Sequence, residues 1–83
     1  MIVTPYATYD QESDALYVRL AEGEVGSTVM LDDLRMIDYR ADQTVIGIEF
    51  LEASEGVELD GVPFAETVEK AIGESGHQIR IFA

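Results

Sequence analysis

The sequence predicts an α+β fold: an antiparallel β-meander of about five short strands, one C-terminal helix packed on one face, and a final short strand. Two observations predict this fold. Up to Leu51, apolar and polar residues alternate in short runs joined by short connections, and connections of that length join antiparallel neighbours. After Ser54, the apolar residues recur at the spacing of a helix face instead of every second position.

Each expected strand is a run in which every second residue is apolar. The five runs span residues 6–9, 15–20, 27–32, 35–39 and 45–51. Pro5 suits the start of the first strand, where no ladder donor is required. In the last and strongest run, Ile46, Ile48 and Phe50 alternate with more polar positions.

Residues 54–62 read as an acidic loop, and the helix follows it. Pro63 is placed at the first helical position, where its missing N–H costs nothing. The expected apolar face of the helix comprises Phe64, Val68, Ala71 and Ile72. Gly73 and Gly76 are expected to end the helix, and residues 77–81 form the last short strand.

Composition limits the possible functions. With 83 residues, we expect one domain over 1–83. Seventeen acidic and five basic residues give a net charge of −12, which argues against direct nucleic-acid binding and against anionic membranes. Cysteine is absent, so there is no disulfide framework or thiolate zinc site. Neither a secretory signal nor a long apolar run is visible, so the expected compartment is the cytoplasm.

The two faces of the predicted sheet differ less than they should. The face expected to meet the helix carries Leu16, Val18, Leu20, Val29, Leu31, Ile37, Ile46, Ile48 and Phe50. The opposite face should be polar, yet it carries Tyr17, Met30, Met36, Val45 and Leu51. These five residues are either scattered surface residues or a contact patch. We predict that they form an interface, with a homodimer as the expected occupant.

Two acidic groups and one histidine are candidates for chemistry. Asp32, Asp38 and Glu49, together with Asp33, could form a carboxylate cluster for a metal ion or for acid/base catalysis. The alternative is a solvated face on which Arg19 pairs with Glu49 and Arg35 pairs with Asp32.

The other two candidates are weaker. The run Asp10, Glu12, Asp14 begins like a calcium loop, but Ala15 and Ala21 replace the required Gly and Glu, so we expect a hairpin turn. His77 supports no catalytic triad. The sequence therefore predicts no catalytic residue, metal ligand or cofactor site.

Gly47 lies inside the strongest strand, where glycine is costly. If the second and fifth strands are neighbours, Tyr17 would cover Gly47 and Arg19 would lie beside Glu49.

Several motifs in order resemble a known family. They are Tyr9-Asp10, Asp14-Ala15-Leu16-Tyr17-Val18, Ile37-Asp38-Tyr39, Val45-Ile46-Gly47-Ile48-Glu49-Phe50-Leu51 and Ala53-Ser54. Over roughly residues 6–54 the chain resembles the short bacterial proteins of domain-of-unknown-function family 2283. The resemblance supplies no catalytic residues. It implies an antitoxin-like or partner-binding role, because some relatives are encoded beside small toxin-like proteins.

Two positions depart from the family pattern. Gln43 follows the turn acid where the family usually has glycine; either Gln43 is strained at a positive φ or, as we expect, the turn type differs. Arg40 replaces a common acid.

We therefore expect a small acidic interaction module that forms a homodimer and whose charge suits a basic protein partner. The alternative is a small metal-dependent or acid/base enzyme.

Overall fold

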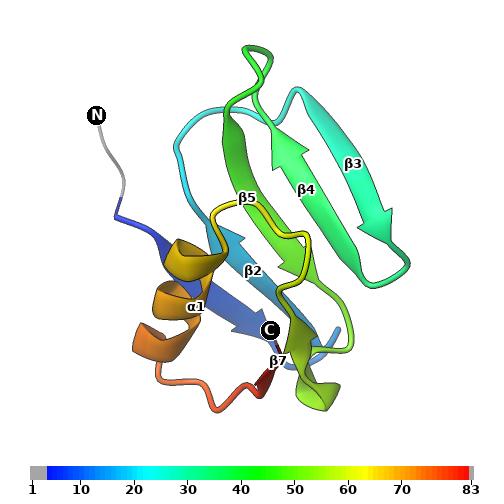
Figure 1. Ribbon diagram of the computed structural model, residues 1–83, viewed down its shortest axis with the longest axis vertical. Coiled ribbons are helices and arrows are strands. Elements are labelled where there is room, and N and C mark those ends of the chain that lie inside the picture. The colour runs from blue at the N-terminus through cyan, green and yellow to red at the C-terminus, as the bar shows by residue number, and fades with distance from the viewer. Residues whose placement is uncertain (1–3, 83) are drawn as a thin grey trace.

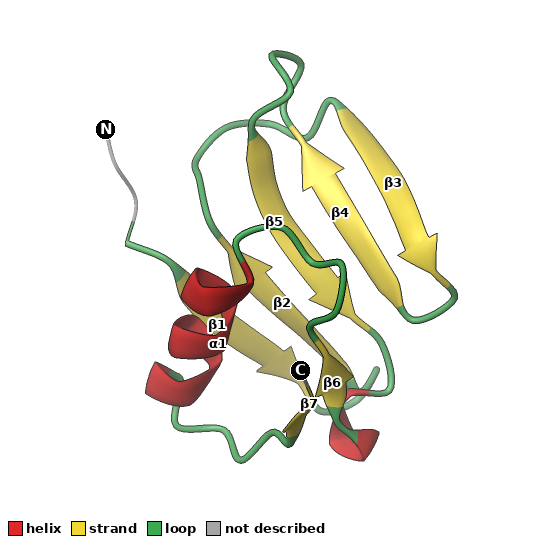
Figure 2. Ribbon diagram, in the orientation of Figure 1, coloured by secondary structure: helices red, strands yellow, loops and turns green. Residues whose placement is uncertain are grey.

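The computed structural model describes residues 4–82 and confirms the α+β class (Figure 1). Five antiparallel strands form one sheet, and a separate parallel pair lies near the helix (Figure 2). The elements are β1 (Tyr6–Asp10), β2 (Ala15–Arg19), β3 (Ser27–Asp32), β4 (Arg35–Tyr39), β5 (Val45–Phe50), η1 (Ala53–Glu55), β6 (Val57–Glu58), α1 (Ala65–Glu74) and β7 (Ile81–Phe82).

The strand order in the sheet is β1-β2-β5-β4-β3, which differs from a simple meander. The hairpin β1–β2 joins the β3–β4–β5 meander through antiparallel pairing of β2 with β5. Residues 20–26 carry the chain from β2 to the far edge of the sheet, where β3 pairs with β4 alone. As a result, β3 is the edge strand farthest from α1 in Figure 1.

The helix covers part of one sheet face. α1 packs against β1 and β2, and Val68, Ala71 and Ile72 are buried there as expected. The expectation for Phe64 was wrong, because this residue adopts φ 56° immediately before the helix and its side chain is 63% exposed. α1 therefore starts at Ala65, later than Pro63 suggested.

The predicted helix-facing set is largely confirmed. Leu16, Val18, Ile37, Ile46, Ile48 and Phe50 are buried, and Leu20 is half-buried against the core. Val29 and Leu31 were wrongly assigned to the core. They are 49% and 36% exposed, because α1 packs against β1 and β2 at the other end of the sheet.

Residues 54–62 are more ordered than the expected loop. Val57, Leu59 and Val62 are buried in the core. Val57 and Glu58 form β6, which pairs in parallel with β7. The last strand is thus confined to Ile81–Phe82 and joins β6 instead of the five-stranded sheet.

Two bulges change which side chains share a face. In β3 the register shifts between Met30 and Asp32, so Asp32 pairs with Arg35 on the face that carries Phe50. In β5 the register with β4 shifts at Ile46, so that Asp38 pairs with Gly47 but Tyr39 pairs with Val45. Each extra residue reverses the alternation beyond it.

Besides Phe64, three residues other than glycine in the described chain have a positive φ, and they lie in turns or bends. Asp14 has φ 54°, Gln43 φ 74° and Glu52 φ 52°. The turn position of Gln43 therefore does require a positive φ, and our expectation of a different turn type was wrong. A non-glycine residue is strained there.

Candidate functional site

Exposed apolar side chains concentrate on β3 and the turns that flank it. We call Val25, Val29, Met30, Leu31 and Leu34 the β3 edge surface. They are five of the eight exposed large hydrophobic residues in the described chain, with exposed fractions from 36% to 62%. All six residues of β3 are exposed. Val29 and Met30 face opposite sides of the sheet, so these residues surround the edge strand on both of its faces. Exposed apolar residues that gather on one element mark an interaction surface more often than scattered ones do.

The β3 edge surface is also locally uncharged. No charged residue occurs from Val25 to Leu31, although the whole chain carries −12. As an edge strand, β3 has backbone groups on its outer side that no neighbouring strand within residues 4–82 satisfies. Such an edge is a template for pairing with another strand. Its two acids, Asp32 and Asp33, come at the end of the strand.

The structure brings together three of the five predicted interface residues. Tyr17 and Met36 both lie opposite Glu49, and Met30 lies opposite Met36. This row crosses four strands on the face away from α1. Tyr17 and Met36 are half-buried, and Met30 is 62% exposed.

The other two predicted residues lie elsewhere. The β5 bulge places Val45 opposite Tyr39, and both pack against the main core. Val45 lines a hollow of about 450 Å³ with Leu20 and Phe64 at the start of α1. Leu51 follows β5, where its N–H donates to the carbonyl of Leu34 at 2.8 Å.

Tyr17 is held within its own chain. Its hydroxyl donates to Asp38 at 2.9 Å, and the Thr28 hydroxyl donates to the same carboxylate at 2.7 Å. Burial, followed by the hydrogen bond to Asp38, raises the pKa of Tyr17 well above its usual value. The Tyr17 ring also covers Gly47 as predicted. Tyr17 therefore stabilises the sheet whether or not a partner contacts it.

The predicted pairing of Arg19 with Glu49 was wrong. The register of β2 and β5 places Arg19 opposite Gly47. Its guanidinium donates to the carbonyls of Ala21 and Gly23 instead, at 2.9 and 3.0 Å.

The carboxylates considered for metal binding are divided between separate partners. Asp32 pairs with Arg35 at 2.7 Å, and this hydrogen bond lowers the pKa of Asp32. Asp38 instead accepts from Tyr17 and Thr28 on the opposite face. Over residues 4–82, no group of three or more His, Asp and Glu is placed to hold a metal ion. The structure therefore keeps Asp32 and Asp38 apart, on opposite faces of the sheet.

The run from Asp10 to Asp14 forms the expected turn and one unexpected contact. Asp10 accepts the N–H groups of Glu12 and Ser13 at 3.0 and 3.4 Å. The Asp14 carboxylate accepts from the N–H of Ser54 at 2.8 Å and from its hydroxyl at 2.6 Å. It also accepts from the Tyr9 hydroxyl at 2.6 Å. These bonds fasten the β1–β2 turn to η1.

The same bonds set the ionisation of Asp14. The hydroxyl of Ser54, followed by that of Tyr9, lowers the pKa of the Asp14 carboxyl. His77 lies against this cluster, with its ring centroid 5.6 Å from that of Tyr9. Tyr9, Asp14 and Ser54 all belong to the motifs that carry the family resemblance, and this is the signal in the sequence that could have identified the cluster.

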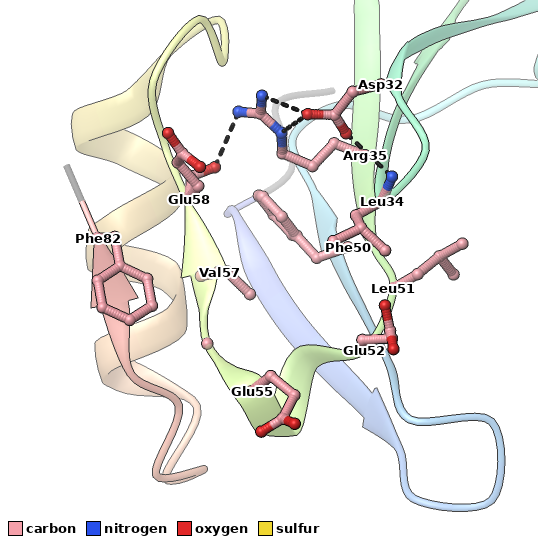
Figure 3. Close-up of a pocket in the computed structure, with 11 residues that line it drawn as sticks. Asp32, Leu34, Arg35, Phe50, Leu51, Glu52, Glu55, Val57, Glu58 and Phe82 are labelled. Carbon is pink, nitrogen blue, oxygen red and sulfur yellow. Dashed lines mark hydrogen bonds and ion pairs between the residues drawn. The ribbon is translucent and has the colours of Figure 1, made fainter.

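A second feature is a hollow of about 220 Å³ between the ends of β4 and β5 and the β6–β7 pair (Figure 3). We call it the acidic hollow. Its lining includes the apolar residues Leu34, Phe50, Leu51, Val57 and Phe82 and the acidic residues Asp32, Glu52, Glu55 and Glu58. Arg35 spans one side, donating to the carbonyls of Glu58, at 3.1 Å, and Asp60.

Within the described residues, no helix has the length and apolar character needed to cross a membrane.

Residues 7–54 match the family described as "Protein of unknown function (DUF2283)". The match includes the whole five-stranded sheet except Tyr6, and α1 lies outside it. Comparison with curated proteins and with solved structures gives no match.

Proposed function

The chain belongs to the DUF2283 family of proteins of unknown function, and we propose that it is a non-enzymatic interaction module. In this proposal, two copies associate through the β3 edge surface, and the acidic surface of the dimer binds a basic protein partner in the cytoplasm. The observation that carries the proposal is the concentration of exposed apolar residues on an uncharged edge strand.

A second copy suits the β3 edge surface because the surface is neutral and apolar. A basic partner would gain little from a segment that carries no charge, whereas two neutral edges can approach despite the −12 of each chain. A two-fold axis at Met30 would set Val29 opposite Leu31 of the partner subunit and keep the two Asp32 carboxylates apart. Isologous contacts of this kind are the commonest in homo-oligomers.

The size of the chain supports the same conclusion. A domain of about 80 residues buries only a little more than about 60% of its unfolded surface. This one has no disulfide to compensate. Covering the β3 edge surface would remove apolar area from water and stabilise the fold.

The acidic surface supports the second half of the proposal. Seventeen acidic side chains against five basic ones give a field that attracts positively charged proteins. Such attraction raises association rates and disfavours acidic partners. A basic, toxin-like protein would be a suitable partner for this surface, in keeping with an antitoxin-like role.

The dimer is tested by two matched lysine substitutions. Met30→Lys places a charge at the centre of the β3 edge surface, and Phe64→Lys places one at the start of α1, at nearly equal exposure, 62% and 63%. Sedimentation velocity should show a dimer for the wild type and for F64K, and a monomer for M30K. A wild-type monomer at high concentration would refute the homodimer.

The partner is tested separately, by co-purification from the source cell followed by reconstitution with the purified candidate. A stoichiometric complex with a basic protein, weakened by added salt, would support the proposal. A stoichiometric complex with an acidic protein would contradict it.

A further inference from the structure

We propose that the acidic hollow is the site at which the dimer receives a single cationic side chain, that of an arginine, from the basic partner. This inference rests on the proposed function and deepens it by naming where and through which chemistry the partner binds. It depends on the shape of the hollow, on its apolar walls and on the unpaired charges at its rim, which are considered in turn.

The size of the hollow selects the kind of occupant. Sites for cofactors and small molecules enclose about 300–1,000 Å³. The acidic hollow encloses about 220 Å³, which is below that range but suits one long side chain. An occupant of this size would be presented by another chain.

The walls suit an aliphatic stem. Phe50 and Val57 are almost fully buried and form the inner part of the lining, while Phe82 is 45% exposed. Figure 3 shows Phe82 and Val57 on the β6–β7 side and Phe50 on the β5 side. Arginine lays its methylene groups on apolar surface of this kind while its guanidinium remains at the polar edge.

The rim supplies unpaired negative charge. Of its four carboxylates, Asp32 is neutralised by Arg35. In residues 4–82, the carboxylates of Glu52, Glu55 and Glu58 take part in neither of the two ion pairs. The guanidinium of Arg35 donates to Asp32 and to the carbonyls of Glu58 and Asp60 instead of to these three carboxylates. Three acids therefore line one hollow from different sides (Figure 3), and a guanidinium at its rim would form charge-assisted hydrogen bonds with those it reaches.

The hollow is built on fixed backbone. Gly56 adopts φ 107°, and a side chain there would collide with the ring of Phe82. The Phe82 ring already has the guanidinium of Arg80 at 5.9 Å from its centroid, so a wall of the hollow is compatible with a cation. A preformed site loses less entropy when a partner binds.

The test is an NMR titration of the isotopically labelled chain with N-acetyl-arginine amide. We expect shifts confined to the amides of residues 34–35, 51–58 and 81–82, with saturation in the range of about 1–10 mM for a single side chain. N-acetyl-citrulline amide, which has the same shape and no charge, should cause no such shifts.

Two triple variants separate the hollow from the general acidity of the chain. E52Q/E55Q/E58Q removes the rim charges, and E24Q/E69Q/E74Q removes three exposed charges elsewhere; each changes −12 to −9. The rim variant should lose at least about tenfold in affinity, whereas the control should change by less than about twofold. Shifts spread over the whole surface, equal losses in both variants, or no shifts at all would overturn the inference.

The outcomes distinguish this inference from the proposed function. Leu34 belongs both to the β3 edge surface and to the lining of the hollow, but Glu52, Glu55 and Glu58 lie outside the β3 edge surface. E52Q/E55Q/E58Q should therefore sediment as a dimer like the wild type. If the chain forms a dimer but does not bind N-acetyl-arginine amide, only the proposal for the acidic hollow is refuted. A monomer that binds arginine at the hollow refutes the β3 dimer alone.

Discussion

The phenol ring of Tyr17 on β2 occupies the space above Gly47 on β5, so the two residues share one position of the sheet surface. Gly47 is buried although it lies on the face away from α1. From this position above Gly47, the Tyr17 hydroxyl donates to Asp38 at 2.9 Å.

Replacing Gly47 should therefore be costly. In Gly47→Ala the new Cβ would collide with the Tyr17 ring and lie 2.7 Å from the Val18 carbonyl oxygen, which is backbone. We expect the free energy of unfolding to fall by about 2 kcal/mol in urea denaturation. Gly73→Ala is the control. The added Cβ would have no neighbour within 4 Å, and alanine in place of glycine within α1 should raise the free energy of unfolding by about 1 kcal/mol. Equal effects in the two variants would contradict this account.

Gln43 should be improved by glycine. It has φ 74°, a conformation that costs a residue with a Cβ roughly 1 kcal/mol. Gln43→Gly should raise the melting temperature, with a gain of about 1 kcal/mol that the greater freedom of the unfolded glycine partly offsets. Gly76→Ala is the reverse change. The new Cβ would have no clash, but Gly76 has φ 82°, a conformation that strains alanine, so the substitution should lower the free energy of unfolding. A lower stability for Q43G as well would contradict the conclusion that Gln43 is strained by its positive φ.

The proposed dimer should tighten as salt is added. The β3 edge surface is uncharged, while each chain carries −12, so long-range repulsion opposes association and is screened by ions. Sedimentation equilibrium at about 0.02 and about 0.5 M NaCl should give a lower dissociation constant at the higher concentration. A dimer that weakens with salt would indicate that ion pairs hold it.

Stability should depend on pH through Asp14. The hydroxyls of Ser54 and Tyr9 hold the pKa of Asp14 below its usual 3.8 in the folded chain. A group with a depressed folded pKa stabilises the fold above its unfolded pKa and loses that effect as pH falls through the folded value.

Asp14→Asn should therefore have a lower melting temperature than the wild type at pH 7, and the difference should shrink below about pH 4. Asparagine tolerates the positive φ at this position, so the comparison isolates the charge and its hydrogen bonds. Ser54→Ala should behave in the same way, because it removes the hydroxyl that donates to Asp14 at 2.6 Å. A difference that persists undiminished at pH 2 would contradict the mechanism.

Local alternation was enough to predict most of the sheet. The bounds of β3 and β4 were predicted as the structure has them, and Leu16, Val18 and Ile48 were assigned to the core correctly. A period of two is a direct consequence of strand geometry, so it can be read from neighbouring residues. The position of a strand within the sheet depends on pairing between segments that are far apart in the sequence. Local alternation therefore could not show that β3 is an edge strand and that Val29 is exposed.

Bulges explain the wrong assignments within the candidate site. One extra residue at Leu31 turns Asp32 toward Arg35, and one at Ile46 turns Val45 toward the core. An inserted residue leaves the local pattern unchanged in the sequence but reverses every face beyond it. Val57 and Leu59 were missed because the acids around them obscure a strand of only two residues.

The exposure of all six residues of β3 has a consequence for how the family can diverge. A strand with no buried side chain contributes little to the core, so substitutions there can change which chain is bound while the fold remains nearly as stable. Under the proposed dimer, partner choice therefore depends on β3, whereas folding depends on the buried residues outside this strand. Substitutions in β3 would then change the partner and leave the rest of the sheet intact.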